Sequence, residues 1–146
     1  MIHIRKAQET DIPRLEELFL ITRRQTFHWE NPDKFQLEDF KKVTTGETLF
    51  VAEDDQGEIL GFISVYEQEV PPFIHHLFVA PNHQRGGIGE QLIRSLFPWL
   101  PRPYRLKCLL RNHKALEFYL KNNWIALESG DSEEGPYFLF ELPKDN

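Results

Sequence analysis

Apolar residues recur every three or four positions near the start of the chain, which is the spacing of an amphipathic helix. They form one such face over residues 12–22, directly after Thr10 and Asp11, and Pro13 stands in the first turn. Thr and Asp are good N-caps and proline is common at the first helical positions, so the pattern predicts a helix that begins here. The stretch KFQLEDFKKV, residues 34–43, predicts a second, short amphipathic helix.

A third helix follows the glycine-rich stretch in the middle of the chain. Ile88, Leu92 and Leu96 recur every four residues, and a helix cannot continue through Pro98, so it must end before that residue. A fourth helix is predicted over RNHKALEFYLKNN, with Asn112 as its N-cap.

Seven runs have the composition and the flanking turn residues that are typical of strands. The segments that contain them are MIHIR (1–5), TLFVAEDDQGEILGFISVYEQEV (48–70, two strands around the turn DDQG), PPFIHHLFVAP (71–81), YRLKCLL (104–110), WIALE (124–128) and YFLFEL (137–142). Strands and helices do not alternate regularly, which argues against a doubly wound fold. The sequence therefore predicts an α/β chain of the α+β type, with about seven strands in one sheet and about four helices.

Composition limits the domain count and the classes of partner. With 146 residues and 40% hydrophobic content the chain can bury one core, so we expect a single domain over residues 1–146. The formal net charge of -6 disfavours nucleic acid and anionic membrane surfaces and suits a cationic partner. The charged start MIHIRKAQETD lacks the apolar run of a secretory signal, and no window is apolar enough to span a membrane, so we expect a cytoplasmic protein.

The chain offers little to a metal ion. Cys108 is the only cysteine, which excludes an intramolecular disulfide and a cysteine-based zinc site. The six histidines show no spacing of the H-E-x-x-H kind. We therefore expect no metal.

Three of the eight glycines fall within four residues of the stretch NHQRGGIGEQLIRSL. A dinucleotide-binding fingerprint would need glycine where Leu92 stands, and the Gly-Lys-Ser/Thr of a Walker loop is absent. Gly87 and Gly89 instead fit an anion cradle, because the missing Cβ atoms let a phosphate reach backbone N–H groups at a helix N-terminus. Gln84 and Arg85 add side-chain donors. A glycine turn without a ligand is the alternative.

With its flanking strand, LFVAPNHQRGGIGEQLI resembles the acetyl-coenzyme A binding segment of the GCN5-related N-acetyltransferase (GNAT) family. RNHKALEFYLKNNWIALE resembles the second signature of that family, and IRKAQETDIPRL resembles its usual first strand and helix. This resemblance covers nearly the whole chain and implies a GNAT-like acyl-CoA acyltransferase fold, with a mixed, mostly antiparallel central sheet and acetyl-CoA as the cosubstrate. The family usually has glycine where this chain has Asn123, and we expect Asn123 to take the left-handed conformation that ends a helix.

The resemblance also implies where acetyl-CoA binds. The strand over residues 74–79 should diverge from KCLL, so that the amide-rich pantetheine arm lies along its free edge as an extra strand. Asn112 has an equally good alternative role as a plain helix cap. The implied cofactor-binding residues are Leu77, Phe78, Val79, Gln84, Arg85, Gly86, Gly87, Ile88, Gly89, Glu90 and Asn112.

Catalytic groups follow from the same family pattern. Tyr119 matches its usual tyrosine and is the candidate acid for the departing thiolate, with a core aromatic as the alternative. His75 matches a strand position that carries a histidine base in some members, with a partly exposed strand histidine as the alternative. On a regular strand His75 and His76 face opposite ways, so we expect at most one of them in a given cleft. Cys108 suits packing better than a two-step acyl-enzyme route, which favours direct attack by the acceptor.

The expected acceptor is a primary amine, of a small molecule or a protein, held opposite the cofactor. The candidate acceptor-binding residues are Trp29 and His28, in the stretch TFHWENPDKF, together with His76. Aromatic rings and Glu30 in that stretch, and the acidic turn SGDSEEGP, fit a cationic group, unless Trp29 is core and the turn is simply solvated. The predicted function is acetyl-CoA-dependent N-acetyl transfer. A non-catalytic acyl-CoA-binding sensor on the same fold is the alternative, and a homodimer stays open.

Overall fold

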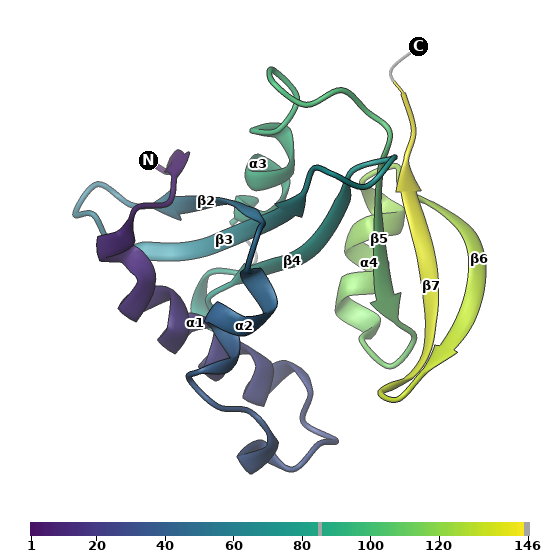
Figure 1. Cartoon of the computed structure of the whole chain (residues 1–146), viewed down its shortest axis with the longest axis horizontal. Helices are drawn as coiled ribbons and strands as arrows, with labels where there is room; N and C mark the ends of the chain where they lie inside the picture. The colour runs from purple at the N-terminus through teal and green to yellow at the C-terminus, as the bar shows by residue number, and fades with distance from the viewer. Residues whose placement is uncertain (85, 145–146) are drawn as a thin grey trace.

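A computed structural model describes residues 1–84 and 86–144. Seven strands form one sheet, and four α-helices pack on it (Figure 1). The strands are β1 (His3–Lys6), β2 (Thr48–Glu53), β3 (Ile59–Tyr66), β4 (Phe73–Val79), β5 (Tyr104–Leu109), β6 (Ile125–Ser132) and β7 (Gly135–Leu142), and the helices are α1 (Ile12–Thr26), α2 (Asp39–Thr44), α3 (Ile88–Arg94) and α4 (His113–Lys121).

The strand order in the sheet is β1-β2-β3-β4-β5-β7-β6, and every neighbouring pair is antiparallel except β4 and β5. The predicted mixed, mostly antiparallel sheet of about seven strands with about four helices is therefore confirmed. The turn predicted at DDQG joins β2 to β3, and its Gly57 has φ = 80°. A residue with a Cβ atom is strained at that angle, which accounts for glycine in the turn.

Different helices cover the two faces of the sheet, and each pair buries its own apolar core (Figure 1). Beneath α1 and α2, the rings of Phe19, Phe40 and Phe62 meet edge to face at centroid distances of 5.5–6.0 Å. Beneath α3 and α4, the larger core contains Leu92 of α3 and Tyr104 of β5, both fully buried. These cores fix each helix on its face of the sheet.

Helix ends follow the residues that the sequence marks for them. Asp11 precedes α1 as its N-cap, and a proline stands in the first turn. Asn112 is the N-cap of α4, where its Oδ1 atom accepts a hydrogen bond from the Ala115 N–H at 3.4 Å. Asn123 has φ = 72° just after α4, the left-handed conformation expected at that point. The predicted N-cap role of Asn112 and the predicted conformation of Asn123 are confirmed.

The helix predicted over residues 34–43 is wrong in its first half. α2 begins only at Asp39, and a separate turn of 3-10 helix (Pro32–Lys34) precedes it. The Asp39 carboxylate accepts the backbone N–H of Gln36 at 3.0 Å and the Arg23 guanidinium at 3.2 Å. These bonds give the segment before α2 an alternative to helical hydrogen bonding, which the spacing of apolar residues does not reveal.

β4 and β5 are joined at one end only. Their ladder contains the pair Phe73 and Arg105, and the Arg105 N–H donates to the Pro72 carbonyl at 3.0 Å. Beyond this point no further pair joins the two strands in the described part of the chain, and Figure 1 shows them diverging, with α4 visible between them. The predicted divergence of residues 74–79 from KCLL is therefore confirmed.

Neither a metal centre nor a membrane-spanning helix is found within residues 1–84 and 86–144. No three His, Cys, Asp or Glu side chains of these residues gather into a group that could hold a metal ion. None of the helices described is both long enough and apolar enough to cross a bilayer.

Asp11 ties the start of α1 to β1. Its carboxylate accepts two hydrogen bonds from the Arg5 guanidinium, at 2.8 and 2.9 Å, and one from the Gln8 N–H at 2.7 Å. Arg5 also pairs with Glu53 of β2 at 3.1 Å. Asp11 is only 8% exposed, so water competes little, and the hydrogen-bonded Arg5 guanidinium holds the pKa of the Asp11 carboxyl below its usual value.

We expect Asp11→Asn to lower the free energy of unfolding by about 1–2 kcal/mol at pH 7, because the charge-assisted hydrogen bonds lose their anion. The Asp11 pKa is depressed in the folded state, so its contribution is complete above the unfolded-state pKa and is lost as the pH falls through the folded-state pKa. Urea denaturation should therefore show wild type and variant converging below about pH 4.

Asp55→Asn is the control, because Asp55 pairs with the N-terminus at an exposed site, and it should change stability little. A wild-type advantage over Asp11→Asn that persists undiminished at about pH 3 would contradict the assignment.

Candidate active site

The end of β4 and the segment after it hold most of the predicted cofactor-binding residues. Leu77 and Val79 pack their side chains against the core beneath α3 and α4, and Phe78 packs against the core beneath α1. The Gln84 side chain folds back, and its Nε2 atom donates to the Val79 carbonyl at 3.1 Å. Arg85 lies outside the described residues. The main chain of β4, rather than these side chains, therefore borders the divergence from β5.

Gly86, Gly87 and Gly89 differ in what a side chain would meet. Gly87 is the N-cap of α3 with φ = 77°, and no atom of the described residues, its chain neighbours aside, lies within 4 Å of a Cβ placed there. A Cβ at Gly86 would make an ordinary contact, 3.7 Å from the His83 carbonyl oxygen. A Cβ at Gly89 would lie 3.2 Å from the Phe118 ring, so this glycine lets α3 and α4 pack closely. Gly87 is the position where the backbone requires glycine and the space is open.

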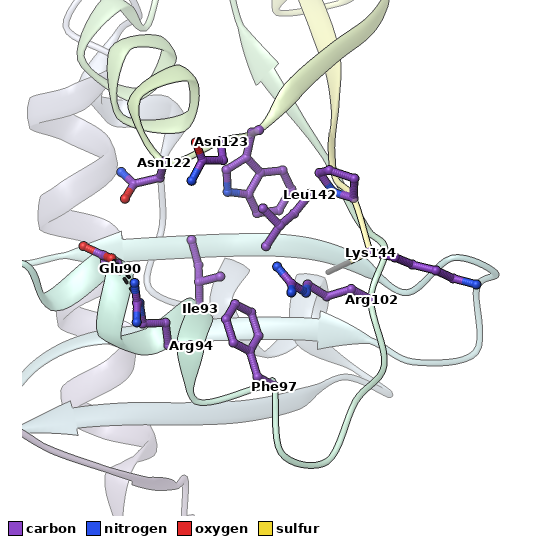
Figure 2. Close-up of a pocket in the computed structure, with 11 residues that line it drawn as sticks. Glu90, Ile93, Arg94, Phe97, Arg102, Asn122, Asn123, Leu142 and Lys144 are labelled. Carbon is purple, nitrogen blue, oxygen red and sulfur yellow. Dashed lines mark hydrogen bonds and ion pairs between the residues drawn. The ribbon is translucent and has the colours of Figure 1, made fainter. Parts of the chain in front are cut away.

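Ile88 and Glu90 occupy the first turn of α3. Ile88 is 3% exposed and anchors the turn in the core. The Glu90 carboxylate pairs with Arg94 one turn later, with Oε1 at 3.0 Å from both Nε and Nη2. Figure 2 shows this pair lining a cavity of about 370 Å³ between α3, the residues after α4 and the end of β7. The Glu90 side chain therefore has a partner within the protein, which leaves its main chain for the predicted cofactor contact.

Tyr119 lies in the core on the α3 and α4 side of the sheet. It is 8% exposed, and the ring centroids of Trp124 and Phe140 lie 5.5 and 5.7 Å from its own. Burial raises the pKa of the Tyr119 phenol well above its usual value, and interaction with the Cys108 thiol adds to the rise. The hydroxyl therefore stays protonated at neutral pH, as a proton donor must. The same surroundings also fit the alternative, in which Tyr119 is only a core aromatic.

A β-bulge in β4 corrects the expectation that His75 and His76 face opposite ways. Ser64 of β3 pairs with His76, and Val65 pairs with Ile74, so His75 is an extra residue in the ladder. Ile74 points to the core beneath α3 and α4, whereas both histidines lie on the other face. Their ring centroids are 6.2 Å apart. The prediction that the two histidines face opposite ways was wrong, because a one-residue bulge interrupts the alternation of side chains.

The two histidines have different surroundings. His76 packs edge-on against Phe19 of α1 at 5.2 Å, and burial lowers its pKa to about 4, so it is neutral at neutral pH. The His75 side chain stays 34% exposed, and its Nδ1 atom contacts the Oε2 atom of Glu47. Tyr66 stacks on the His75 ring at 5.9 Å. Of the two, His75 is the one that a substrate can reach.

Glu47 and Ser64 are site residues that the sequence did not reveal. Glu47 lies between α2 and β2, and its side chain is 3% exposed. One carboxylate oxygen contacts His75, and the other accepts a hydrogen bond from the fully buried Ser64 hydroxyl. Burial raises the pKa of the Glu47 carboxyl, and His75 opposes the rise. The only sequence signal is an acidic residue after Gly46 at the start of an apolar strand, and it does not indicate a partner on β4.

The predicted acceptor-binding residues His28 and Trp29 lie in the loop between α1 and α2. Their rings meet at 5.2 Å, and the Arg111 guanidinium carbon lies 5.8 Å from the Trp29 ring centroid. Glu30 pairs with Lys34 at 3.4 Å. The ring and the carboxylate that were expected to hold a cationic acceptor thus each have a cation of this chain beside them. The Arg111 contact brings the loop next to the start of α4.

Candidate groups for proton transfer lie on opposite faces of the sheet. His75, with Glu47 behind it, lies on the α1 and α2 side, whereas Tyr119 lies on the α3 and α4 side with Cys108. Next to His75, β4 has already left β5. A thioester laid along the free edge of β4 would have a base on one side and an acid on the other, which is what acyl transfer to an amine needs.

Comparisons with known proteins agree with this fold. A model of the Acetyltransferase (GNAT) family matches residues 12–124. The peptidyl-lysine N-acetyltransferase YiaC of Escherichia coli (strain K12) is 30% identical over 150 residues, which cover 96% of each chain. The solved structure of the PaiA N-acetyltransferase from Thermoplasma acidophilum in complex with coenzyme A has a TM-score of 0.77 at 18% identity, over 98% of this chain and 99% of that one. The solved structure of the spermidine N-acetyltransferase from Vibrio cholerae, in complex with CoA and spermine, has a TM-score of 0.74 at 18% identity, over 98% of this chain and 95% of that one.

The two solved structures share the fold at low identity, whereas the family match and the E. coli relative share sequence over most of the chain. That relative is an enzyme, which favours the catalytic function over the non-catalytic sensor. The sequence motifs, the fold and these matches agree, and the chain belongs to the GCN5-related N-acetyltransferase family.

Proposed function

We propose that this chain, an acetyl-CoA-dependent N-acetyltransferase, transfers the acetyl group to a primary amine by direct attack, with His75 as the base and Tyr119 as the acid. The observation that carries the proposal is the divergence of β4 from β5, with a reachable histidine on one face and a protonated phenol on the other. A thioester along the free edge of β4 would lie between the face that holds His75 and the face that holds Tyr119, with no hydrogen-bonded ladder in the way.

The free edge of β4 supports a place for the pantetheine arm. An extended chain of amides pairs with an unpaired strand edge as a further strand would, here through the main chain of residues 77–79. Gly87 supports a place for the diphosphate, because its left-handed conformation and the open space around it leave backbone N–H groups accessible at the start of α3. Gln84 and Asn112 already hydrogen-bond to the main chain, so their part is to shape the two loops beside the cofactor.

The chemistry of the amine defines what His75 and Tyr119 have to do. A lysine-like amine has a pKa near 10.4, so a base must take one proton before the nitrogen can attack the thioester. An imidazole is suited to that step at neutral pH, and His75 is exposed enough to perform it. The leaving sulfur then needs a proton, and the phenol of Tyr119, which is protonated at neutral pH, is the proposed donor.

Cys108 supports the direct route over an acyl-enzyme. The thiol is 5% exposed, and burial raises its pKa to about 12. At pH 7 the thiolate is then on the order of 10⁻⁵ of the total. A two-step route would need that thiolate as the nucleophile.

The acceptor that we propose is a lysine side chain of a polypeptide. The E. coli relative is a peptidyl-lysine N-acetyltransferase. Arg111 stands beside Trp29 of the acceptor loop, and no carboxylate of the described residues pairs with it. A guanidinium donates hydrogen bonds to peptide carbonyls and repels further ammonium groups, so this surface suits a lysine in a peptide better than a polyamine.

An amine panel tests the acceptor, with released CoA thiol as the readout. We expect kcat/KM for a peptide with one internal lysine to exceed that for spermidine by about tenfold, because Arg111 attracts the peptide and repels the polyamine. Arg111→Gln should narrow the difference, and Lys6→Gln on β1 at the sheet edge should leave it unchanged. Faster turnover of spermidine would contradict the acceptor assignment. Acetyl-CoA binding without thiol release from any amine would favour the non-catalytic sensor.

Tyr119→Phe tests the acid. Removing the hydroxyl should lower kcat by about 10²-fold, because the thiolate leaves without its proton donor, and should leave the Kd for acetyl-CoA unchanged in isothermal titration calorimetry. Cys108→Ala is the matched control in the same core and should keep its turnover. An unchanged kcat in Tyr119→Phe removes Tyr119 from the mechanism, and loss of kcat in Cys108→Ala argues for the acyl-enzyme.

Gly87→Val tests the diphosphate cradle. The valine side chain should block a backbone donor, and losing one charge-assisted hydrogen bond corresponds to roughly 10–100-fold in the Kd for acetyl-CoA. Gly57→Val is the matched control, since Gly57 has φ = 80° and equally open space in the β2–β3 turn. Both variants should lose about 1–2 kcal/mol of stability through backbone strain. Equal losses of affinity in the two variants would show that strain, and not the cradle, is the cause.

A further inference from the structure

Glu47 lies in the turn from α2 to β2 and contacts both β3 and β4. The backbone of this turn is held by a hydrogen bond of its own. The Glu47 N–H donates to the Thr44 carbonyl at 3.0 Å, and Gly46 before it has φ = 80°, so the turn from α2 to β2 has a defined shape. From that turn the carboxylate reaches the neighbouring strands. Ser64 of β3 donates its hydroxyl to Oε1, and Nδ1 of His75 of β4 contacts Oε2.

The bonds around Glu47 determine which nitrogen of His75 is free. The Glu47 side chain is 3% exposed and Ser64 is fully buried, so water does not replace either partner of the carboxylate. The Ser64 hydroxyl has one proton, which it gives to Oε1, so the proton that faces Oε2 is the one on Nδ1 of His75. In the neutral ring the lone pair is then on Nε2.

The β-bulge brings His75 to this carboxylate. Ile74 and Leu77 both face the core beneath α3 and α4. On a regular strand only one residue would separate two residues that face the same side. Because of the extra residue, both His75 and His76 lie between these two positions and on the opposite face. There Glu47 contacts His75, and Phe19 packs against His76. The bulge thus gives the site one histidine bound to a carboxylate and one that is enclosed by aromatic rings.

We propose that Glu47 is a positioning residue for acetyl transfer, which fixes the His75 ring so that the Nε2 lone pair is available to the acceptor amine. The inference rests on the proposed function, because it takes His75 as the base. Nε2 removes one proton from the acceptor ammonium, and the nitrogen attacks the thioester carbonyl. The C–S bond then breaks, the sulfur takes a proton from Tyr119, and the second proton of the nitrogen restores the phenol. Nε2 finally returns its proton to solvent. While the ring carries both protons, the Glu47 carboxylate stabilises the imidazolium, as an orienting carboxylate does in a catalytic triad.

A purely structural pair would hold the α2–β2 turn on the sheet and would not affect turnover directly. Thr44→Ala is a matched control for that role, because the Thr44 hydroxyl is in the same turn, 8% exposed, and donates to the Phe40 carbonyl at 2.7 Å. It loosens the turn without touching the carboxylate. Ser64→Ala removes the partner that holds Oε1 and keeps the charge of Glu47.

A double-mutant cycle in kcat separates the positioning role of Glu47 from a purely structural one. The substrates are acetyl-CoA and whichever amine of the panel described above gives the most thiol release. Glu47→Gln should lower kcat by about 10–100-fold, the usual effect of losing the partner that orients a functional histidine, with the KM for acetyl-CoA unchanged. Ser64→Ala should show a smaller loss, and Thr44→Ala should keep kcat. In a His75→Ala background, adding Glu47→Gln should cost less than about twofold, because the residue through which Glu47 acts is gone.

A second measurement needs no acceptor. Nitrogen chemical shifts of the His75 imidazole at pH 8 should show the proton on Nδ1 in the wild type, and Glu47→Ala should move it largely to Nε2, the more common tautomer of a free ring. A wild-type ring protonated on Nε2 overturns the proposal.

The kinetic outcomes distinguish this inference from the function on which it rests. If His75→Ala lowers kcat and Glu47→Gln lowers it further by its full factor, Glu47 does not act through His75 and only the positioning role falls. The same holds if Thr44→Ala loses as much turnover as Glu47→Gln. If His75→Ala keeps wild-type turnover, the assignment of the base falls and takes the positioning role with it.

Discussion

The sheet of this enzyme is held together across its centre by a parallel pair of strands that is hydrogen-bonded at one end only. One register pair and the bond from Arg105 to the Pro72 carbonyl join β4 to β5, after which the strands separate. Backbone N–H and C=O groups need hydrogen-bond partners. A strand edge that pairs with no other strand can therefore bind a ligand that is rich in amides. The core beneath α3 and α4, which contains residues of β3 and β4 as well as of β5 and β7, holds the two parts of the sheet in place where the ladder ends.

The separation of β4 from β5 also explains how the proposed proton-transfer groups can be divided between the two faces of the sheet. His75, the proposed base, contacts the Glu47 carboxylate on the α1 and α2 side, and Ser64 in turn donates to that carboxylate. Tyr119 stands on the other side, in an apolar core that keeps its phenol protonated. A base is helped by a partner for the positive charge that it gains, whereas a neutral phenol needs no such partner. One face of a closed sheet would not readily supply both environments.

The sequence predicted those parts of the fold that depend on neighbours along the chain. Asn112 caps a helix and Asn123 ends it because each acts on backbone groups a few residues away, so the local pattern suffices. The glycine stretch was recognised for the same reason. The error over residues 34–43 arose where Arg23, distant in sequence, and Asp39 hold the segment before α2 in a different shape.

The candidate site was only partly accessible to sequence reasoning. The bulge at His75 inserts one residue into a strand without glycine or proline to mark it, so the strict alternation of side chains gave the wrong facing. Glu47 was missed because its partners lie 17 and 28 positions later in the chain, and only the antiparallel pairing of β2, β3 and β4 brings them together. Arg111 beside Trp29 is a contact of the same kind.

The only thiol of the chain lies inside the molecule. Oxidants and alkylating reagents act on accessible thiolates, and Cys108, 5% exposed with a pKa raised to about 12 by burial, presents almost none. The enzyme is therefore expected to keep working in an oxidising medium that inactivates proteins with surface cysteines. It also follows that any reactive sulfhydryl that appears in solution during turnover belongs to the coenzyme and not to the protein.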